Sequence, residues 1–383
     1  MRVIVAPDSF KGSLSSMEVA EAVKGALLEV QQGCEVLCLP ISDGGEGLVQ
    51  ALASPLGAEI VSAQVHDPLG RRISASYAVK GETAVIEMAE ASGLCLVRED
   101  ERDIMKASSA GLGELIVDAL GRGCRDFLIG IGGSATNDAG MGMLQALGWR
   151  FYDKDENALP AGGGYLERIE RIDSSEADIR LREASFKVAC DVDNPFFGPE
   201  GAAAVFGPQK GASPEQVGAL DCGLHNFARL VRESTGVNLQ AVPGSGAAGG
   251  VGGALKAFLA APLLPGAHLV LDALNFDSLA SEADFIITGE GSLDAQSLHG
   301  KACHAVLQRG HALGVPVIAV CGVVKDGTQV DGAGFEKILP VKPGGQSIAD
   351  AMRPDVAKAN IRNAVKCLFG PGSSFRSPSP GKI

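Results

Sequence analysis

The segment Asp126-Phe-Leu-Ile-Gly-Ile-Gly-Gly-Ser-Ala-Thr-Asn-Asp138 joins an apolar run to a turn of glycines and small polar residues. The apolar residues at 127–131 are typical of a buried strand, and the glycine pair ends it because glycine accepts backbone angles that other residues avoid. A helix is predicted over 140–147. The residues of the turn are Gly132, Gly133, Ser134, Thr136 and Asn137. Strand, turn and helix start together predict backbone N–H groups that face a phosphate, with an ordinary capped turn as the alternative interpretation.

The composition of the chain is ordinary for a globular protein and does not argue against a small anionic substrate. Its 383 residues suffice for one large or two medium domains. The net charge of −13 argues against a nucleic-acid or anionic-membrane partner, and the aromatic content of 5% argues against base-stacking surfaces. No apolar run approaches 18 residues, so no membrane span is expected.

The cysteine pattern indicates a reducing, cytoplasmic location. The nine cysteines are scattered and include no C-x-x-C pair, which also makes a structural zinc site improbable. The first residues lack the charged and apolar regions of a signal peptide. The sequence as a whole leaves open whether the protein is a monomer or a homodimer.

Strands and helices alternate at both ends of the chain. A strand at 2–6, an amphipathic helix at 13–29 and a strand at 35–41 predict a βαβ unit with parallel strands. The last third returns to this alternation. Five predicted strands, near residues 3, 36, 285, 317 and 338, therefore indicate an α/β fold with one doubly wound parallel sheet.

The middle of the chain has a different pattern and is predicted to be a mixed α/β domain inserted into the first. Short strands at 60–65, 73–79 and 83–88 are separated by turn residues and indicate hairpins that leave the parallel sheet. The glycine-rich segment 244–253 is either a flexible linker or a turn into a packed helix. The predicted domains are 1–62 with 280–371, and 63–279, followed by a disordered Ser/Pro-rich tail at 372–383.

Acidic residues and lysines gather at the glycine-rich ends of the predicted strands. The acids are Asp43, Glu46, Asp138, Glu290 and Asp294, and the lysines are Lys11, Lys210 and Lys301. Phosphoryl transfer uses this mixture, because cations hold phosphate oxygens, carboxylates hold Mg²⁺ and one carboxylate accepts the proton of the attacking hydroxyl. The alternative is that these residues only form turns and solvated surface. The chain contains no P-loop, dinucleotide fingerprint or zinc-protease motif.

Several ordered motifs resemble those of the bacterial type I glycerate kinases over nearly the whole chain, up to about residue 370. The matching stretches are 6–11, 42–47, 130–138, 189–192 with 194–195, 206–212, 243–250, and 288–291 with Asp294, 296–297 and 300–301. The resemblance implies ATP-dependent phosphorylation of D-glycerate, with 2-phosphoglycerate as the usual product. It also implies Mg²⁺ and two α/β domains, one of them flavodoxin-like.

The chain departs from the family pattern at three places. It has Ser-Ser-Ala-Gly-Leu-Gly at 108–113 where relatives tend to have threonines, Leu48 where Thr is usual, and Ser292-Leu293 where Arg is frequent. These departures leave two alternatives. One is a kinase of another small hydroxy acid, and the other is a catalytically weakened binding or regulatory paralogue.

We assign roles to individual residues on the hypothesis of direct transfer without a covalent intermediate. The catalytic residues are Lys11, Lys210 and Asp191, the last as general base. The substrate-binding residues are Asp8, Ser9, Asn194 and Lys301. The ATP-binding residues are Gly132, Gly133, Ser134, Thr136, Asn137, Gly289, Glu290 and Gly291, and the metal ligands are Asp43, Glu46 and Asp294.

Overall fold

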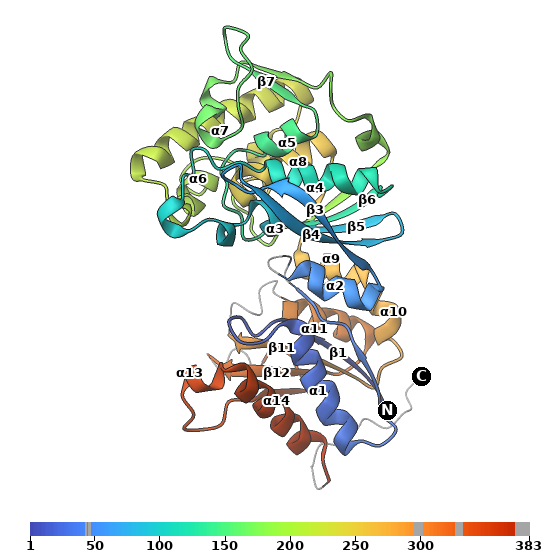
Figure 1. Cartoon of the computed structure of the whole chain (residues 1–383). Coiled ribbons are helices and arrows are strands. Elements are labelled where there is room, and N and C mark those ends of the chain that lie inside the picture. The colour runs from blue at the N-terminus through green and yellow to red at the C-terminus, as the bar shows by residue number, and fades with distance from the viewer. Residues whose placement is uncertain (43, 45–46, 295–301, 326–331, 372–383) are drawn as a thin grey trace. The chain divides into compact units, whose positions relative to one another are not determined.

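The computed structural model describes residues 1–42, 44, 47–294, 302–325 and 332–371 of the chain (Figure 1). These residues form two compact units. Unit 1 comprises the described residues of 1–43, 50–56 and 267–383, and unit 2 comprises those of 44–49 and 57–266. The chain therefore begins and ends in unit 1, and it returns to unit 1 briefly at 50–56 between the two segments of unit 2.

Unit 1 contains a parallel sheet of five strands in the order β2-β1-β11-β12-β13. The strands are β1 (Arg2–Pro7), β2 (Glu35–Cys38), β11 (Phe285–Leu293), β12 (Val317–Val324) and β13 (Lys337–Pro340). Numbered within the sheet, this order is 2-1-3-4-5, which is the flavodoxin-like order. The predicted doubly wound sheet of five strands is confirmed. Its strand order reverses between β1 and β11, and ligands of such sheets bind beyond the carboxyl ends of the strands at that switch point.

Helices cover both faces of this sheet. One core cluster joins Val5 and Ile287 of the strands to Val23 and Val365 of α1 and α14, and a smaller cluster joins Ala319 to the α11 residue Cys303. The helices of unit 1 are α1 (Ser16–Val30), α10 (Phe276–Ala280), α11 (Ala302–Leu313), α13 (Ile348–Ala351) and α14 (Pro354–Phe369). Two further helices each contain residues of both units, namely α2 (Leu48–Leu56) and α9 (Gly266–Ala273). The three central strands, β1, β11 and β12, are largely buried, and their buried parts form continuous apolar runs in the sequence.

Unit 2 contains a mixed sheet of six strands in the order β10-β9-β6-β5-β4-β3. The strands are β3 (Glu59–His66), β4 (Arg72–Lys80), β5 (Thr83–Glu87), β6 (Asp126–Gly130), β9 (Ser185–Ala189) and β10 (Leu263–Leu264). The pairs β3–β4 and β4–β5 are antiparallel, which confirms the predicted hairpins, and the remaining pairs are parallel. A separate hairpin joins β7 (Arg150–Tyr152) and β8 (Arg171–Asp173).

Helices and aromatic side chains build the core of unit 2. The helices are α3 (Ala89–Ser92), α4 (Ala110–Gly121), α5 (Met141–Ala146), α6 (Ala202–Phe206), α7 (Pro214–Thr235) and α8 (Val251–Leu259). Short 3-10 turns lie at Leu94–Leu96, Glu99–Glu101, Gly163–Arg168, Ile179–Glu183, Pro208–Lys210, Leu239–Ala241 and Ala247–Gly250. Phe127 and Phe186 of neighbouring strands stack with ring centroids 4.7 Å apart. The segment 244–253 is a buried turn into α8, so the linker interpretation is wrong.

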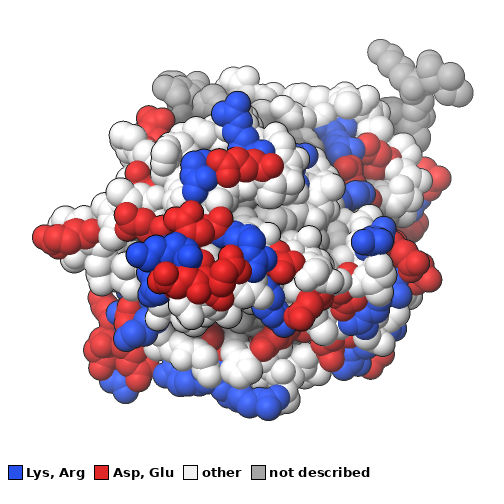
Figure 2. Space-filling view, turned by 90° about the horizontal axis from the view of Figure 1, so that it is seen from above, with Lys and Arg blue, Asp and Glu red and all other residues white. Residues whose placement is uncertain are grey.

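Charged side chains of both signs are interspersed on the surface. On the face shown in Figure 2, lysines and arginines alternate with aspartates and glutamates. In the described chain as a whole, partly exposed ion pairs include Arg171 with Glu156 at 2.6 Å and Arg229 with Glu233 at 2.9 Å. Among the described helices, none is both long enough and apolar enough to cross a bilayer.

Candidate functional site

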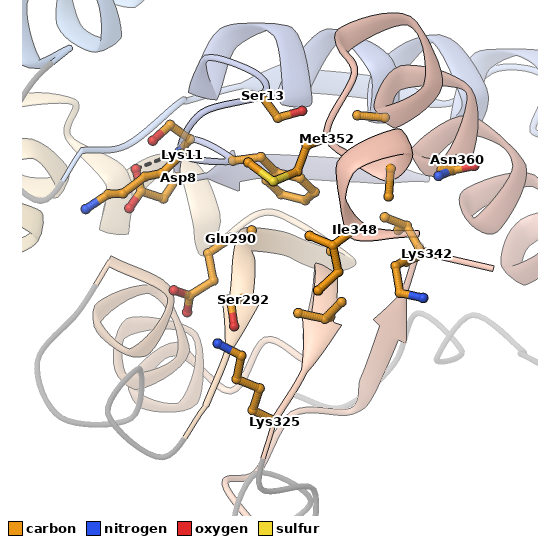
Figure 3. Close-up of a pocket in the computed structure, with 18 of the residues that line it drawn as sticks. Asp8, Lys11, Ser13, Glu290, Ser292, Lys325, Lys342, Ile348, Met352 and Asn360 are labelled. Carbon is orange, nitrogen blue, oxygen red and sulfur yellow. Dashed lines mark hydrogen bonds between the residues drawn. The ribbon is translucent and has the colours of Figure 1, made fainter. Parts of the chain in front are cut away.

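A pocket of about 370 Å³ lies at the switch point of the unit 1 sheet (Figure 3). Its walls come from the segment after β1, from the ends of β11 and β12, and from α13 and α14. Six residues predicted from the sequence line it, namely Asp8, Ser9, Lys11, Glu290, Gly291 and Asp294. Segments almost 300 residues apart in the sequence thus contribute to one hollow, because β1 and β11 are neighbours in the sheet.

Charged groups of both signs meet at one end of this pocket. Figure 3 shows the carboxylates of Asp8 and Glu290 and the amino groups of Lys11 and Lys325 at this end. The backbone fixes Asp8, because its N–H donates to the carbonyl of Gly289 at 2.8 Å and its Oδ1 accepts from the N–H of Ser9 at 2.6 Å. Amino groups can bind the oxygens of a polyphosphate, and carboxylates can bind the metal ion that accompanies it.

Strand β11 includes the glycine-rich residues at its carboxyl end. Residues 288–291 continue the strand to Leu293, and β11 pairs with β12 along this stretch. A Cβ at Gly289 would lie 2.2 Å from the carbonyl oxygen of Val320, so glycine is needed here for strand contact. Burial, and secondarily the charge of Glu290, raise the pKa of Cys321 to about 12, so this thiol is neutral.

In unit 2, the predicted phosphate segment is held by a buried lysine. The Nζ of Lys210 donates to the Oγ of Ser134 and to the carbonyl of Thr136, both at 2.8 Å. The Lys210 side chain is buried, as are Ser134, Thr136 and Asn137. Burial lowers the pKa of Lys210 to about 7, against the opposing charge of Asp138. Lys210 is therefore hydrogen-bonded directly to the predicted phosphate segment.

The helix predicted over 140–147 is present as α5, and the polar turn residues at 134–137 lie before it. The first residue of α5 is Met141, so the donors at 134–137 do not start a helix. Ala139 and Gly140 have positive φ values of 54° and 72°, which interrupt any helix between Asn137 and Met141. The carbonyl of Gly249 accepts from the N–H of Ala139 at 2.9 Å and fixes this conformation. The turn residues 134–137 therefore lie outside α5, and their assignment to a phosphate stays a prediction.

Asp138 anchors the segment to α4, a role that the sequence did not reveal. Its buried carboxylate accepts from Ser109 N at 2.8 Å and Ser109 Oγ at 2.9 Å. It also accepts from the N–H groups of Gly140 and Gly142, both at 3.1 Å. Burial raises the pKa of Asp138, and these hydrogen bonds act in the opposite direction.

Asp191 and Asn194 follow β9, which lies beside β6 in the same sheet. The register pairs Gly130 with Ala189, so the two segments leave adjacent strands at the same edge. The Oδ1 of Asp191 accepts from Gly266 N at 2.8 Å. The Nδ2 of Asn194 donates to the carbonyl of Glu200 at 2.8 Å. Local backbone contacts therefore orient both side chains.

Three predicted residues, Asp43, Glu46 and Lys301, lie outside the described residues, as does the predicted tail at 372–383. Within the described ranges, no group of three or more His, Cys, Asp or Glu side chains is arranged to hold a metal ion. The departures from the family pattern include three leucines, Leu48, Leu112 and Leu293, that are fully buried. These three leucines are therefore part of the packed interior.

Comparison with known proteins identifies the family. The model of the glycerate kinase family matches residues 3–370. A glycerate kinase of Bacillus subtilis (strain 168) is 44% identical over 354 residues, which cover 92% of this chain and 93% of that protein. A glycerate 2-kinase of Escherichia coli (strain K12) is 45% identical over 329 residues, covering 85% of this chain and 86% of that protein.

A solved structure gives the same result for the fold. The crystal structure of a glycerate kinase 2 candidate from Salmonella typhimurium LT2 has a TM-score of 0.88 and 42% sequence identity. The match covers 96% of this chain and 97% of that one. Fold, motifs and relatives agree, and the chain belongs to the glycerate kinase family and is a kinase.

Proposed function

We propose that this kinase transfers the terminal phosphoryl group of ATP to D-glycerate and produces 2-phosphoglycerate. The observation that carries the proposal is the mixed-charge end of the switch-point pocket, where the predicted residues Asp8, Lys11 and Glu290 meet. The name of the relative from Escherichia coli, glycerate 2-kinase, supports the choice of hydroxyl. Family membership supports the choice of substrate.

Each proposed role uses a chemical property of the side chain. Lys11 neutralises charge on the transferred phosphoryl group, and Asp191 accepts the proton of the attacking hydroxyl. Asp8, Ser9, Asn194 and Lys301 bind glycerate. Lys210 holds the segment that contains Ser134 and Thr136, so it acts by positioning that segment.

Mg²⁺ is proposed as the metal, with Asp43, Glu46 and Asp294 as its ligands. Carboxylate oxygens are its preferred donors, and Mg²⁺ commonly uses only one or two of them together with substrate phosphates. Asp294 lines the pocket at the end of β11 and fits that requirement. When bound, the ion neutralises charge on the phosphate oxygens. The residues proposed to bind ATP include Gly132, Gly133, Asn137, Gly289 and Gly291.

A substrate panel tests the proposed function. The protein is incubated with ATP and Mg²⁺ and with D-glycerate, L-glycerate, lactate, glycolate or tartrate, and ADP release is measured. We expect turnover with D-glycerate, and ³¹P NMR of the product should show the phosphate on the C2 hydroxyl. Turnover with another acid but not glycerate would establish the alternative kinase. A protein that binds glycerate but releases no ADP would be the weakened paralogue.

A further inference from the structure

The switch-point pocket also has an apolar wall that has no role in the chemistry described above. The apolar lining residues include Val323, Val341, Ile348, Ala351 and Met352. Ile348 is 63% exposed and Met352 is 40% exposed; Ile348 is the first residue of α13 and Met352 directly follows its last residue (Figure 3). Large apolar side chains that stay in solvent beside a cavity are typical of a surface that a ligand covers.

Glycerate does not match this surface. All three of its carbons carry oxygen, so its burial against Ile348 and Met352 would leave polar groups without partners. A molecule that fits must combine a flat apolar body with a charged chain. The body would cover α13, and the chain would reach the carboxylates and lysines at the other end, 8–11 and 290–294.

A nucleotide has this combination. The faces of its base are apolar, its phosphates are anionic, and the pocket volume of about 370 Å³ lies in the range of small-molecule sites. Polar groups for the edge of a base lie beside the apolar wall. Asn360 Nδ2 donates to Gln346 Oε1 at 2.8 Å and Lys342 Nζ donates to the Gln346 carbonyl at 2.9 Å, which fixes both lining side chains.

We propose that this pocket is the nucleoside site of the phosphate donor, with the base against Ile348 and Met352 and the phosphates toward Lys11 and Lys325. The inference deepens the proposed function and rests on it for the identity of the donor as ATP. It also assigns α13, which carried no predicted site residue, to recognition of the nucleotide. The position agrees with the rule that ligands of doubly wound sheets bind at the switch point.

Binding of ADP tests this assignment without turnover. Isothermal titration calorimetry measures the Kd of ADP with Mg²⁺ for the wild type, Ile348→Ala, Met352→Ala and the control Leu28→Ala. Leu28 is 47% exposed on α1 and does not line the pocket. Each pocket variant should weaken ADP binding by roughly tenfold, since it removes most of one apolar side chain from the contact. Leu28→Ala should leave the Kd unchanged, and the melting temperature should stay constant in all three variants because the side chains are exposed.

Further measurements separate this inference from the proposed function. Inorganic tripolyphosphate should bind much more weakly than ADP, because it has no base. Equal ADP affinity in all variants, or equal affinity of tripolyphosphate and ADP, would overturn the inference even if glycerate is phosphorylated. A raised KM for glycerate with unchanged ADP affinity would place glycerate in the pocket instead. Weakened ADP binding in a protein that does not phosphorylate glycerate would support the pocket and reject the function.

Discussion

The amino group of Lys210 is the clearest case of a single residue whose charge depends on the fold. Its pKa is about 7 in the folded chain, against 10.5 for an ordinary lysine. Between these pH values the unfolded chain binds more protons than the folded chain, so the free energy of unfolding rises with pH. The slope approaches ~1.4 kcal/mol per pH unit at most.

Lys210→Met removes this titration and provides the comparison. Urea denaturation of both proteins at pH 7 and pH 9.5 should show that the wild type gains stability relative to the variant as the pH rises. A difference that is the same at both pH values would mean that Lys210 is not shifted. Other groups that titrate in this range are common to both proteins and cancel.

Asp191 offers a test of the assigned general base. In Asp191→Asn the amide oxygen can still accept from Gly266 N, so the local structure should persist. Loss of the base should lower kcat by roughly 10²–10⁴-fold. Asp193→Asn, an exposed neighbour in the same segment, is the matched control and should keep its turnover. A kcat near that of the wild type in Asp191→Asn would reject the assignment, and a lowered melting temperature would indicate a structural role.

At the scale of elements, the glycines of α4 set how closely it packs. A Cβ at Gly113 would lie 2.4 Å from the carbonyl oxygen of Met143 and 2.7 Å from the Cβ of Ala146 in α5. Gly113→Ala gains about 1 kcal/mol of helix propensity, but the forced separation of the helices costs about 1–3 kcal/mol or more at so short a distance. We expect a net loss of stability in thermal denaturation.

Gly121→Ala is the matched control, at the other end of the same helix. The nearest atom to its added Cβ is Arg180 Nη1 at 3.8 Å, which is an ordinary contact. This variant should be as stable as the wild type or slightly more stable. If the two variants behave alike, helix propensity and not packing decides the outcome, and the close approach of α4 and α5 is not rigid.

The elements also show which features a sequence can predict. Strands β1, β2 and β12 and the hairpins of β3–β5 follow from apolar patterns and turn residues, which are local. The extension of β11 through Gly289–Gly291 does not, because a Thr-Gly-Glu-Gly run has turn composition and stays extended only by pairing with β12. The start of α5 depends on contact with Gly249, more than 100 residues away. Long-range contacts of this kind leave no local pattern.

The same distinction applies to the candidate site. Charged and glycine residues at strand ends pointed to the lining residues Asp8, Lys11 and Glu290, because strand ends of one sheet meet at one edge. The sequence did not indicate the apolar wall, since Ile348 and Met352 resemble ordinary core residues of a helix. Only their exposure beside a pocket distinguishes them.

For the whole molecule, we propose that the two compact units are separate domains. Each has its own sheet and its own core cluster. Native-state hydrogen exchange of the full chain in increasing urea should then show two cooperative groups of amides, one in β1, β11 and β12 and one in β5, β6 and β9. A single free energy of opening shared by all six strands would contradict the proposal.

The place of β1 in its sheet has a consequence for synthesis on the ribosome. β1 lies between β2 and β11, and the carbonyl of its residue Ala6 accepts a hydrogen bond from the hydroxyl of Thr288, 282 positions later in the chain. At translation rates of about 5–20 residues per second, roughly 15–60 s pass before that neighbour exists. For this time the nascent N-terminus exposes an apolar strand edge, the feature that invites aggregation. Expression yield should therefore depend on chaperone supply during translation more than on the stability of the finished enzyme.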